Sequence, residues 1–248
     1  MHLMEKDLKN YIGQLLDKQN PMLPHSTGVK EQILSKYAPK VIIFDIYGTL
    51  LVSASGDVDQ SDINVKNLQR ALIDSGFIIF DDIPQGAFEF ITADFRYTIL
   101  EHHKKKKEKG VPFPEINISE VWNDVLERAE NKLWIKKGNN ACIKQFVVTF
   151  EVLSNKVYPM PGMQEIINDF KQKGIPLGIV SNAQFYTPLI MNHYLNNESG
   201  EETIPPFDPD LTVFSFKLGK GKPDSFLYKS LIPALKKKYK AKPSEVLL

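Results

Sequence analysis

Polar residues in three separate parts of the chain have side chains that can carry out chemistry. They are Asp45 and Thr49, Ser181 and Asn182, and Lys222. A carboxylate such as Asp45 can attack a substrate as a nucleophile. Hydroxyl groups can bind an oxyanion, and a lysine can offset the charge that develops when an anionic nucleophile attacks an anionic substrate. Together these residues predict a catalytic site for an anion.

Apolar segments precede or contain most of these residues, and they have the composition of buried strands. Val41-Ile42-Ile43-Phe44 is β-branched and aromatic and directly precedes Asp45, and a second such segment, 177–181, ends at Ser181. A further strand is predicted over 211–215, and helices over 162–173, 184–195 and 224–239. Alternating strands and helices indicate a doubly wound parallel sheet. Ligands bind at the carboxyl edge of such a sheet, where Asp45 and Ser181 would meet.

The stretch between the first two strands has a different pattern. Amphipathic segments separated by Gly and Pro predict helices over 62–75, 85–109, 118–136 and 139–154. We therefore expect residues 57–156 to be a helical insertion after the first strand. Apolar residues also recur at helical spacing over 3–18, and a short helix is expected over 29–37, so residues 1–38 are predicted to be an N-terminal helical extension.

The order and spacing of these segments resemble the haloacid dehalogenase-like hydrolase superfamily. Residues 41–50 are similar to its first motif, 177–182 to its second, and Lys222-Pro223-Asp224 with Phe226 to its third. The resemblance covers 39–56 and 157–248. It implies an α/β fold whose core is a doubly wound, Rossmann-like parallel sheet. It also implies that 57–156 is an inserted α-helical cap domain, which closes over the site and selects the substrate.

The resemblance assigns roles to individual residues. It implies catalytic roles for Asp45, Tyr47 and Lys222, and substrate or phosphate binding by Thr49, Ser181 and Asn182. It also implies a magnesium-dependent phosphatase that acts on a small phosphorylated metabolite through an aspartyl-phosphate at Asp45. Mg²⁺ would bind the Asp45 carboxylate and the main-chain carbonyl of Tyr47. Lys217 is a rival for the catalytic lysine, but the Pro-Asp sequence after Lys222 favours Lys222.

Tyr47 departs from the pattern of the phosphatases. Those enzymes usually carry Asp-x-Asp in the first motif, and the second Asp acts as acid and base. A phenol with an ordinary pKa near ~10 is a poor base at neutral pH. Asp-x-Tyr-Gly-Thr is similar to the 2-haloacid dehalogenases, in which the carboxylate attacks carbon without a metal. A dehalogenase is therefore an alternative, and a catalytically inactive binding or regulatory module is a third hypothesis.

The family's fourth motif has no counterpart in this sequence. The acidic loop that completes the magnesium site of the phosphatases should follow the strand that begins near Glu245, and the chain ends at Leu248. We therefore expect the core to be C-terminally incomplete. Asp45 and the Tyr47 carbonyl are too few oxygen ligands for Mg²⁺, which needs about six.

Composition limits the partners that the protein could bind. The 248 residues carry 31 basic and 30 acidic side chains, and a net charge of +1 provides no field for binding nucleic acid or an anionic membrane. The single cysteine, Cys142, excludes an intramolecular disulfide. No apolar run approaches the ~18 residues of a membrane span. We expect a cytoplasmic monomer or homodimer that acts on a small molecule, with no nucleic-acid or membrane partner.

Overall fold

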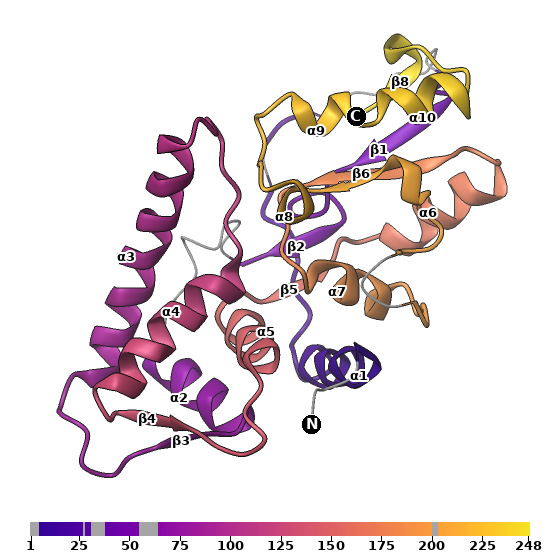
Figure 1. The fold of residues 1–248 in the computed structure, drawn as a ribbon. Helices are drawn as coiled ribbons and strands as arrows, with labels where there is room; N and C mark the ends of the chain where they lie inside the picture. The colour runs from indigo at the N-terminus through magenta and orange to yellow at the C-terminus, as the bar shows by residue number, and fades with distance from the viewer. Residues whose placement is uncertain (1–4, 27, 31–37, 55–63, 200–202) are drawn as a thin grey trace.

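The computed structural model describes residues 5–26, 28–30, 38–54, 64–199 and 203–248 (Figure 1). The α-helices are α1 (Glu5–Leu16), α2 (Val65–Asp74), α3 (Ala87–Glu108), α4 (Ile118–Asn131), α5 (Ile143–Ser154), α6 (Met163–Gln172), α7 (Thr187–Tyr194), α8 (Ser215–Leu218), α9 (Phe226–Lys229) and α10 (Ile232–Lys237). The strands are β1 (Val41–Phe44), β2 (Leu51–Ser53), β3 (Phe77–Ile79), β4 (Ile135–Lys137), β5 (Val157–Pro159), β6 (Leu177–Ser181), β7 (Thr212–Phe214) and β8 (Val246–Leu247). None of the helices within these ranges is long and apolar enough to cross a membrane.

A four-stranded parallel sheet in the order β7-β6-β1-β8 is the centre of the fold. Alternate residues of β1 face opposite sides of this sheet. Val41 and Ile43 belong to one buried cluster with residues of α9 and α10, whereas Ile42 belongs to another cluster with residues of α6 and α7. Helices therefore cover both faces, on either side of β1 and β6 in Figure 1. The predicted doubly wound, Rossmann-like α/β fold is confirmed.

Several elements differ from the sequence-based prediction. The single helix expected over 224–239 is two short helices, α9 and α10, because Pro233 at the start of α10 cannot continue a preceding helix. Two short antiparallel pairs, β2 with β5 and β3 with β4, were not predicted. The second pair lies within the segment expected to be helical throughout. Residues 57–63 of that segment, and most of the short helix expected over 29–37, lie outside the described residues.

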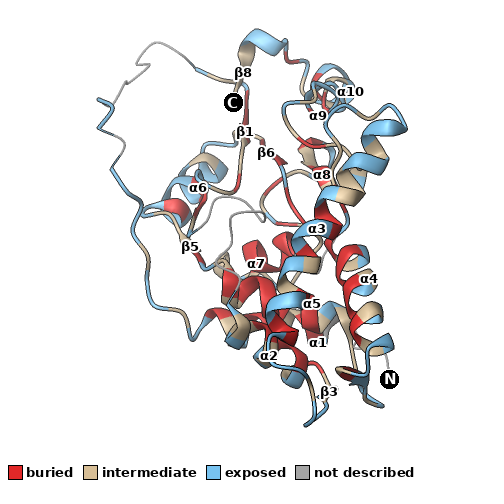
Figure 2. Cartoon of the chain, turned by 90° about the vertical axis from the view of Figure 1, so that its left-hand side faces the viewer, coloured by how far each residue is buried: buried red, intermediate tan, exposed pale blue. Residues whose placement is uncertain are grey.

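Helices α2 to α5 pack around an aromatic cluster of their own. Trp122 stacks on Phe95 with ring centroids 4.1 Å apart, and its ring meets those of Phe146 and Phe150 edge-on. All four side chains are completely buried. The burial colouring in Figure 2 shows the buried faces of α2, α4 and α5 turned toward one another, with exposed residues along the outer side of α3. This aromatic cluster is continuous with the buried residues on one face of the parallel sheet, which include Ile42 and Ile179.

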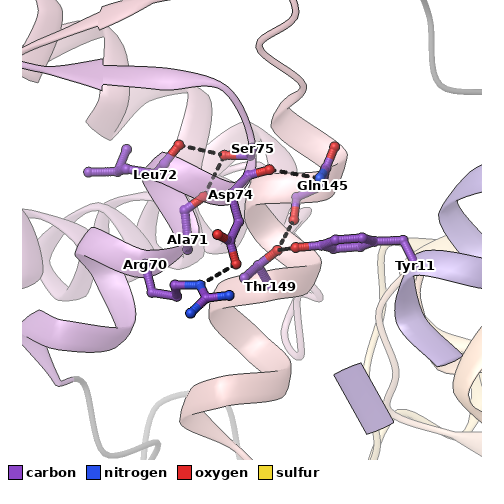
Figure 3. Close-up of polar contacts among 8 residues, drawn as sticks. All are labelled: Tyr11, Arg70, Ala71, Leu72, Asp74, Ser75, Gln145 and Thr149. Atoms are coloured by element: carbon purple, nitrogen blue, oxygen red, sulfur yellow. Dashed lines mark hydrogen bonds and ion pairs between the residues drawn. The ribbon is translucent and has the colours of Figure 1, made fainter. Parts of the chain in front are cut away.

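The N-terminal helix α1 connects the inserted helices to the sheet-bearing part of the molecule. Its apolar face, which includes Ile12, is buried, and α1 packs against both α5 and α7. The hydroxyl groups of Tyr11 and Thr149 are 2.7 Å apart, as Figure 3 shows. On the other side, His193 of α7 lies 3.0 Å from the carboxylate of Asp17. Helix α1 thus links α5 of the insertion to α7 of the core.

Candidate active site

Asp45 lies at the carboxyl end of β1, where the chain leaves the sheet. One carboxylate oxygen, Oδ1, accepts a hydrogen bond from the main-chain N–H of Ile46 at 2.8 Å. The other, Oδ2, lies 2.6 Å from the Nζ atom of Lys222. The Asp45 side chain is 38% exposed, so a substrate can reach it. Gly48, with φ of 80°, permits the sharp turn that follows.

Lys222 is held in place by residues at the carboxyl end of β6. Its main-chain N–H donates to Oδ1 of Asn182 at 2.6 Å, and its Nζ atom lies 3.4 Å from the carbonyl oxygen of Val180. Lys217 instead lies over the rings of Phe214 and Phe216. The structure therefore brings Lys222, rather than Lys217, to the Asp45 carboxylate, and Asn182 orients the loop that carries it.

The Tyr47 phenol reaches α7. Its hydroxyl group lies 2.9 Å from Oγ1 of Thr187. Desolvation is the main cause that raises the pKa of Tyr47 to about 12, and the nearby carboxylates of Glu151 and Asp45 also raise it, while the Thr187 hydrogen bond acts in the opposite direction. The phenol therefore stays protonated at neutral pH and cannot act as a base.

The two hydroxyl groups that the sequence suggested for anion binding are placed differently. Ser181 is completely buried at the end of β6, and its hydroxyl donates to the main-chain carbonyl of Asn182 at 3.2 Å. Thr49 is exposed in the turn after Asp45. Neither residue lines the cavity beside Lys222. The structure thus brings together Asp45, Lys222 and Asn182, but does not place these two hydroxyls on the same surface.

A cavity of about 360 Å³ lies between the core and the inserted helices. The core contributes Tyr47, Asn182 and Lys222 to its wall, and Asp45 lies beside it through the ion pair with Lys222. The inserted segment contributes polar and charged side chains: His103, Lys107, Glu115, Glu151 and Asn155. Polar side chains from the core and from the insertion therefore surround one space next to the candidate nucleophile.

The loop between α3 and α4 contacts the loop that carries Lys222. The main-chain N–H of Gly221 donates to the carbonyl oxygen of Phe113 at 2.9 Å. The Glu115 carboxylate accepts hydrogen bonds from the hydroxyl of Ser215 at 2.5 Å and from the side-chain amide of Gln184 at 3.0 Å. These bonds, which we call the Glu115 latch, hold the insertion against the core at the edge of the cavity.

Glu151 is a cavity-lining residue that sequence reasoning missed. Its side chain is 3% exposed, and Oε2 accepts a hydrogen bond from the Tyr186 hydroxyl at 3.3 Å. Desolvation raises the pKa of Glu151 to about 7, against the opposing effects of Trp122 and Tyr186. A signal was present in the sequence, because Glu151 is the only charged residue in the apolar run from 146 to 153. A charge in such a run is either buried or interrupts the core.

The described residues do not form a magnesium site by themselves. No group of three or more His, Cys, Asp or Glu side chains converges within the part of the chain that the structure describes. Of the two donors that the sequence suggested, the Asp45 carboxylate is paired with Lys222, and Tyr47 offers a single carbonyl oxygen. Mg²⁺ requires about six oxygen ligands in octahedral geometry. The donor set described here is too small for this ion.

The fold and the site together define a class of protein. A doubly wound parallel sheet, with a carboxylate at the end of its first strand and a lysine ion-paired to it, is typical of α/β enzymes that use a carboxylate nucleophile. The family model of the haloacid dehalogenase-like hydrolases matches residues 39–248, and the chain belongs to this family of hydrolases. The resemblance inferred from the motifs is therefore confirmed.

Solved structures with a similar arrangement include several members of the same superfamily. An L-2-haloacid dehalogenase is 19% identical, with a TM-score of 0.37 over 84% of this chain and 76% of that chain. A superfamily hydrolase from Ehrlichia chaffeensis is 19% identical, with a TM-score of 0.35 over 86% and 78% of the two chains. A predicted phosphoglycolate phosphatase from Haemophilus somnus is 17% identical, with a TM-score of 0.35 over 84% and 74%. The comparison with curated proteins found no match.

Proposed function

We propose that this hydrolase cleaves phosphate monoesters of small metabolites, with Asp45 as its nucleophile. The observation that carries the proposal is the Asp45–Lys222 pair, with 2.6 Å between the carboxylate and the ammonium nitrogen, beside a cavity that can hold a metabolite. In this proposal residues 57–156 are the cap that closes over the site. Thr49 and Ser181 keep the phosphate-binding roles that the resemblance implies, which require rearrangement of the turn after Asp45 for Thr49 and of the end of β6 for Ser181.

The proposed reaction has two steps. In the first, an oxygen of Asp45 attacks phosphorus, the bond to the ester oxygen breaks, and the leaving alkoxide takes a proton from solvent water, leaving a hydroxide that the proton released in the second step neutralises. In the second, water attacks the aspartyl-phosphate, phosphate leaves, and the Asp45 carboxylate is regenerated. Lys222 stabilises the negative charge that accumulates near the carboxylate in both steps. No step here passes through Mg²⁺, because the described donors do not form a site for it.

The charge and size of the cavity favour an anionic metabolite. Lys107, His103 and Lys222 line it, while the carboxylate of Glu115 is engaged in the Glu115 latch. A volume of about 360 Å³ falls in the range of roughly 300–1,000 Å³ typical of metabolite and drug sites. A small 2-haloacid would fill only part of this space. A phosphorylated metabolite suits this volume, and Lys107 and Lys222 in the lining can contact its phosphate group.

One observation favours 2-haloacid dehalogenase activity as a second candidate. The phenol of Tyr47 occupies the position of the family's usual acid and base, and its pKa of about 12 prevents it from acting as a base. Dehalogenation does not need an acid at the position of Tyr47, because the halide leaves carbon without taking up a proton. Asp45 and Lys222 would serve in either reaction.

A turnover screen tests the proposal. The purified protein is assayed on phosphate monoesters and on 2-haloacids, each with added Mg²⁺ and with chelator. Release of inorganic phosphate that is lost in Asp45→Asn supports the phosphatase, and its loss in chelator would establish magnesium dependence. Halide release that persists in chelator would instead establish the dehalogenase. No turnover with any ester or haloacid would support the inactive binding module.

A further inference from the structure

The carboxyl group of Glu151 is buried beside the cavity, and its hydrogen bonding is incomplete. Oε2 accepts from Tyr186, whereas Oε1 is a buried atom with no hydrogen-bond partner among the described residues. The indole Nε1 of Trp122 is likewise buried without a hydrogen-bond partner among the described residues, and its interaction with the carboxyl group lowers the pKa of Glu151. A buried polar atom without a partner costs about 1–3 kcal/mol, so native proteins rarely keep one unless it has a function.

The surroundings of Glu151 hold it in position at the cavity wall. The preceding turn of α5 is fixed by the hydrogen bond between Tyr11 and Thr149. The following residue, Val152, is buried, and its carbonyl oxygen accepts a hydrogen bond from the side chain of Gln19. Glu151 thus sits on a rigid helix whose position is set by α1. Glu151 is one of the residues that line the cavity.

The chemistry of this carboxyl group selects a neutral partner that both donates and accepts hydrogen bonds. Burial raises the pKa of Glu151 to about 7, so protonated and ionised forms are both populated at neutral pH. A substrate hydroxyl can donate to the ionised form and accept from the protonated form. A substrate ammonium group would require the ionised form and would meet repulsion from Lys107 and Lys222, which line the same cavity.

We propose that Glu151 binds a hydroxyl group of the substrate and thereby selects phosphate monoesters of hydroxylated metabolites, such as polyols and sugars. This inference rests on the proposed phosphatase function. A site that forms a hydrogen bond with a substrate hydroxyl discriminates strongly against an analogue that lacks the hydroxyl, because the buried group is then left without a partner. Glu151 is therefore a specificity-determining residue contributed by the inserted helices.

The test compares phosphate esters with their deoxy analogues. The pairs are glycerol 3-phosphate with propyl phosphate, and ribose 5-phosphate with 2-deoxyribose 5-phosphate. The wild-type protein should show a kcat/KM at least about tenfold higher for the hydroxylated member of at least one pair, by the energy of one buried hydrogen bond. Glu151→Leu should reduce that ratio toward one. Glu151→Gln, which can still donate and accept hydrogen bonds, should keep most of the preference.

A control variant and a folding check show whether a changed kcat/KM ratio is due to Glu151 itself. Glu127→Leu makes the same change on an exposed face of α4, away from the cavity, and should leave the ratio as in the wild type. Thermal unfolding checks that each variant is folded. If Glu151→Leu is not folded, the inference is tested by the kcat/KM ratios of the wild type and of Glu151→Gln. A wild-type ratio near one, or a ratio unchanged in folded Glu151→Leu, overturns the inference while the phosphatase proposal stands. Absence of phosphate release from every ester overturns the phosphatase proposal and this inference with it.

Discussion

Lys222 and Lys217 are five residues apart, yet only one of them can stabilise charge at Asp45. Replacing Lys222 by Ala should lower kcat/KM by about 10²- to 10³-fold, the effect of losing one preorganised donor to a developing negative charge. Lys217→Ala should change it little, because Lys217 lies over two phenylalanine rings instead. Steady-state kinetics of both variants, on the phosphate ester that the wild type cleaves with the highest kcat/KM, shows which lysine acts at Asp45. If Lys217→Ala is the more damaging change, the third motif has been placed on the wrong lysine.

The raised pKa of Glu151 predicts a pH dependence of stability. The folded protein binds this proton up to a pKa of about 7, whereas the ordinary value is 4.5, so between these values the folded state holds more protons than the unfolded state. The free energy of unfolding should therefore fall as pH rises from about 4.5 to 7, by about 3 kcal/mol from this group, and level off above. Tyr186, Tyr47 and Trp122 are the polar groups that face or act on this carboxyl group.

Urea unfolding of the wild type and Glu151→Gln at a series of pH values measures this effect. The amide cannot ionise, so the unfolding free energy of the wild type relative to that of Glu151→Gln should fall by about 3 kcal/mol as pH rises from about 4.5 to 7, and should stop changing above pH 7. Two parallel curves would show that Glu151 is not the source of the pH dependence and that its carboxyl is better solvated than the structure indicates.

Sequence patterns predicted that Asp45 and Lys222 lie together, but they did not predict the surroundings of this pair. Asp45 could be recognised because it follows a four-residue apolar strand, and Lys222 because of the Pro-Asp sequence after it. The apolar run around Glu151 indicates that this glutamate is buried, but only the packing of α5 shows that it lines the cavity. The side-chain positions of Thr49 and Ser181 depend on the turn after each strand, which motifs do not specify.

Short elements were the ones that sequence patterns could not predict. The strands β1 and β6 were predicted correctly, because each is an uninterrupted apolar run packed between two layers of helices. The strands β2 to β5 have three residues each, too few for an alternating pattern to be recognised. The long helix expected near the end of the chain failed at Pro233, where the missing N–H separates α9 from α10.

Helix α1 should contribute strongly to stability through its buried face. Ile12 is completely buried between α5 and α7, so Ile12→Ala should lower the free energy of unfolding by about 2–5 kcal/mol. Leu23→Ala is the matched control, because the side chain of Leu23 is 77% exposed and its truncation should have little effect. Chemical denaturation of both variants measures the difference. Equal stability of the two would show that α1 is not packed on the rest of the protein in solution.

The Glu115 latch determines how firmly the insertion rests on the core. Glu115→Ala removes the bonds to Ser215 and Gln184, each of which involves a charged acceptor and contributes about 1.5–3 kcal/mol. Amide hydrogen exchange in residues 113–116 and 219–221 should therefore accelerate by about tenfold or more. Glu127→Ala, on an exposed face of the insertion, should leave these rates unchanged. Unchanged rates in Glu115→Ala as well would show that the main-chain bonds alone hold the two parts together.

The pairing of β1 with β6 also has a consequence for how the chain folds. Ile42 lies opposite Leu177, so all of α2 to α5 separates two strands that are neighbours in the sheet. Joining such distant segments in an unfolded chain is slow, because the loop-closure entropy is lost before the new contacts form. The inserted helices share the aromatic cluster around Trp122. In addition β2, which follows β1 in the chain, pairs with β5, which precedes β6. If the insertion folds first, it brings the two ends together and shortens the effective loop, so substitutions in the Trp122 cluster should slow the assembly of a sheet they do not touch.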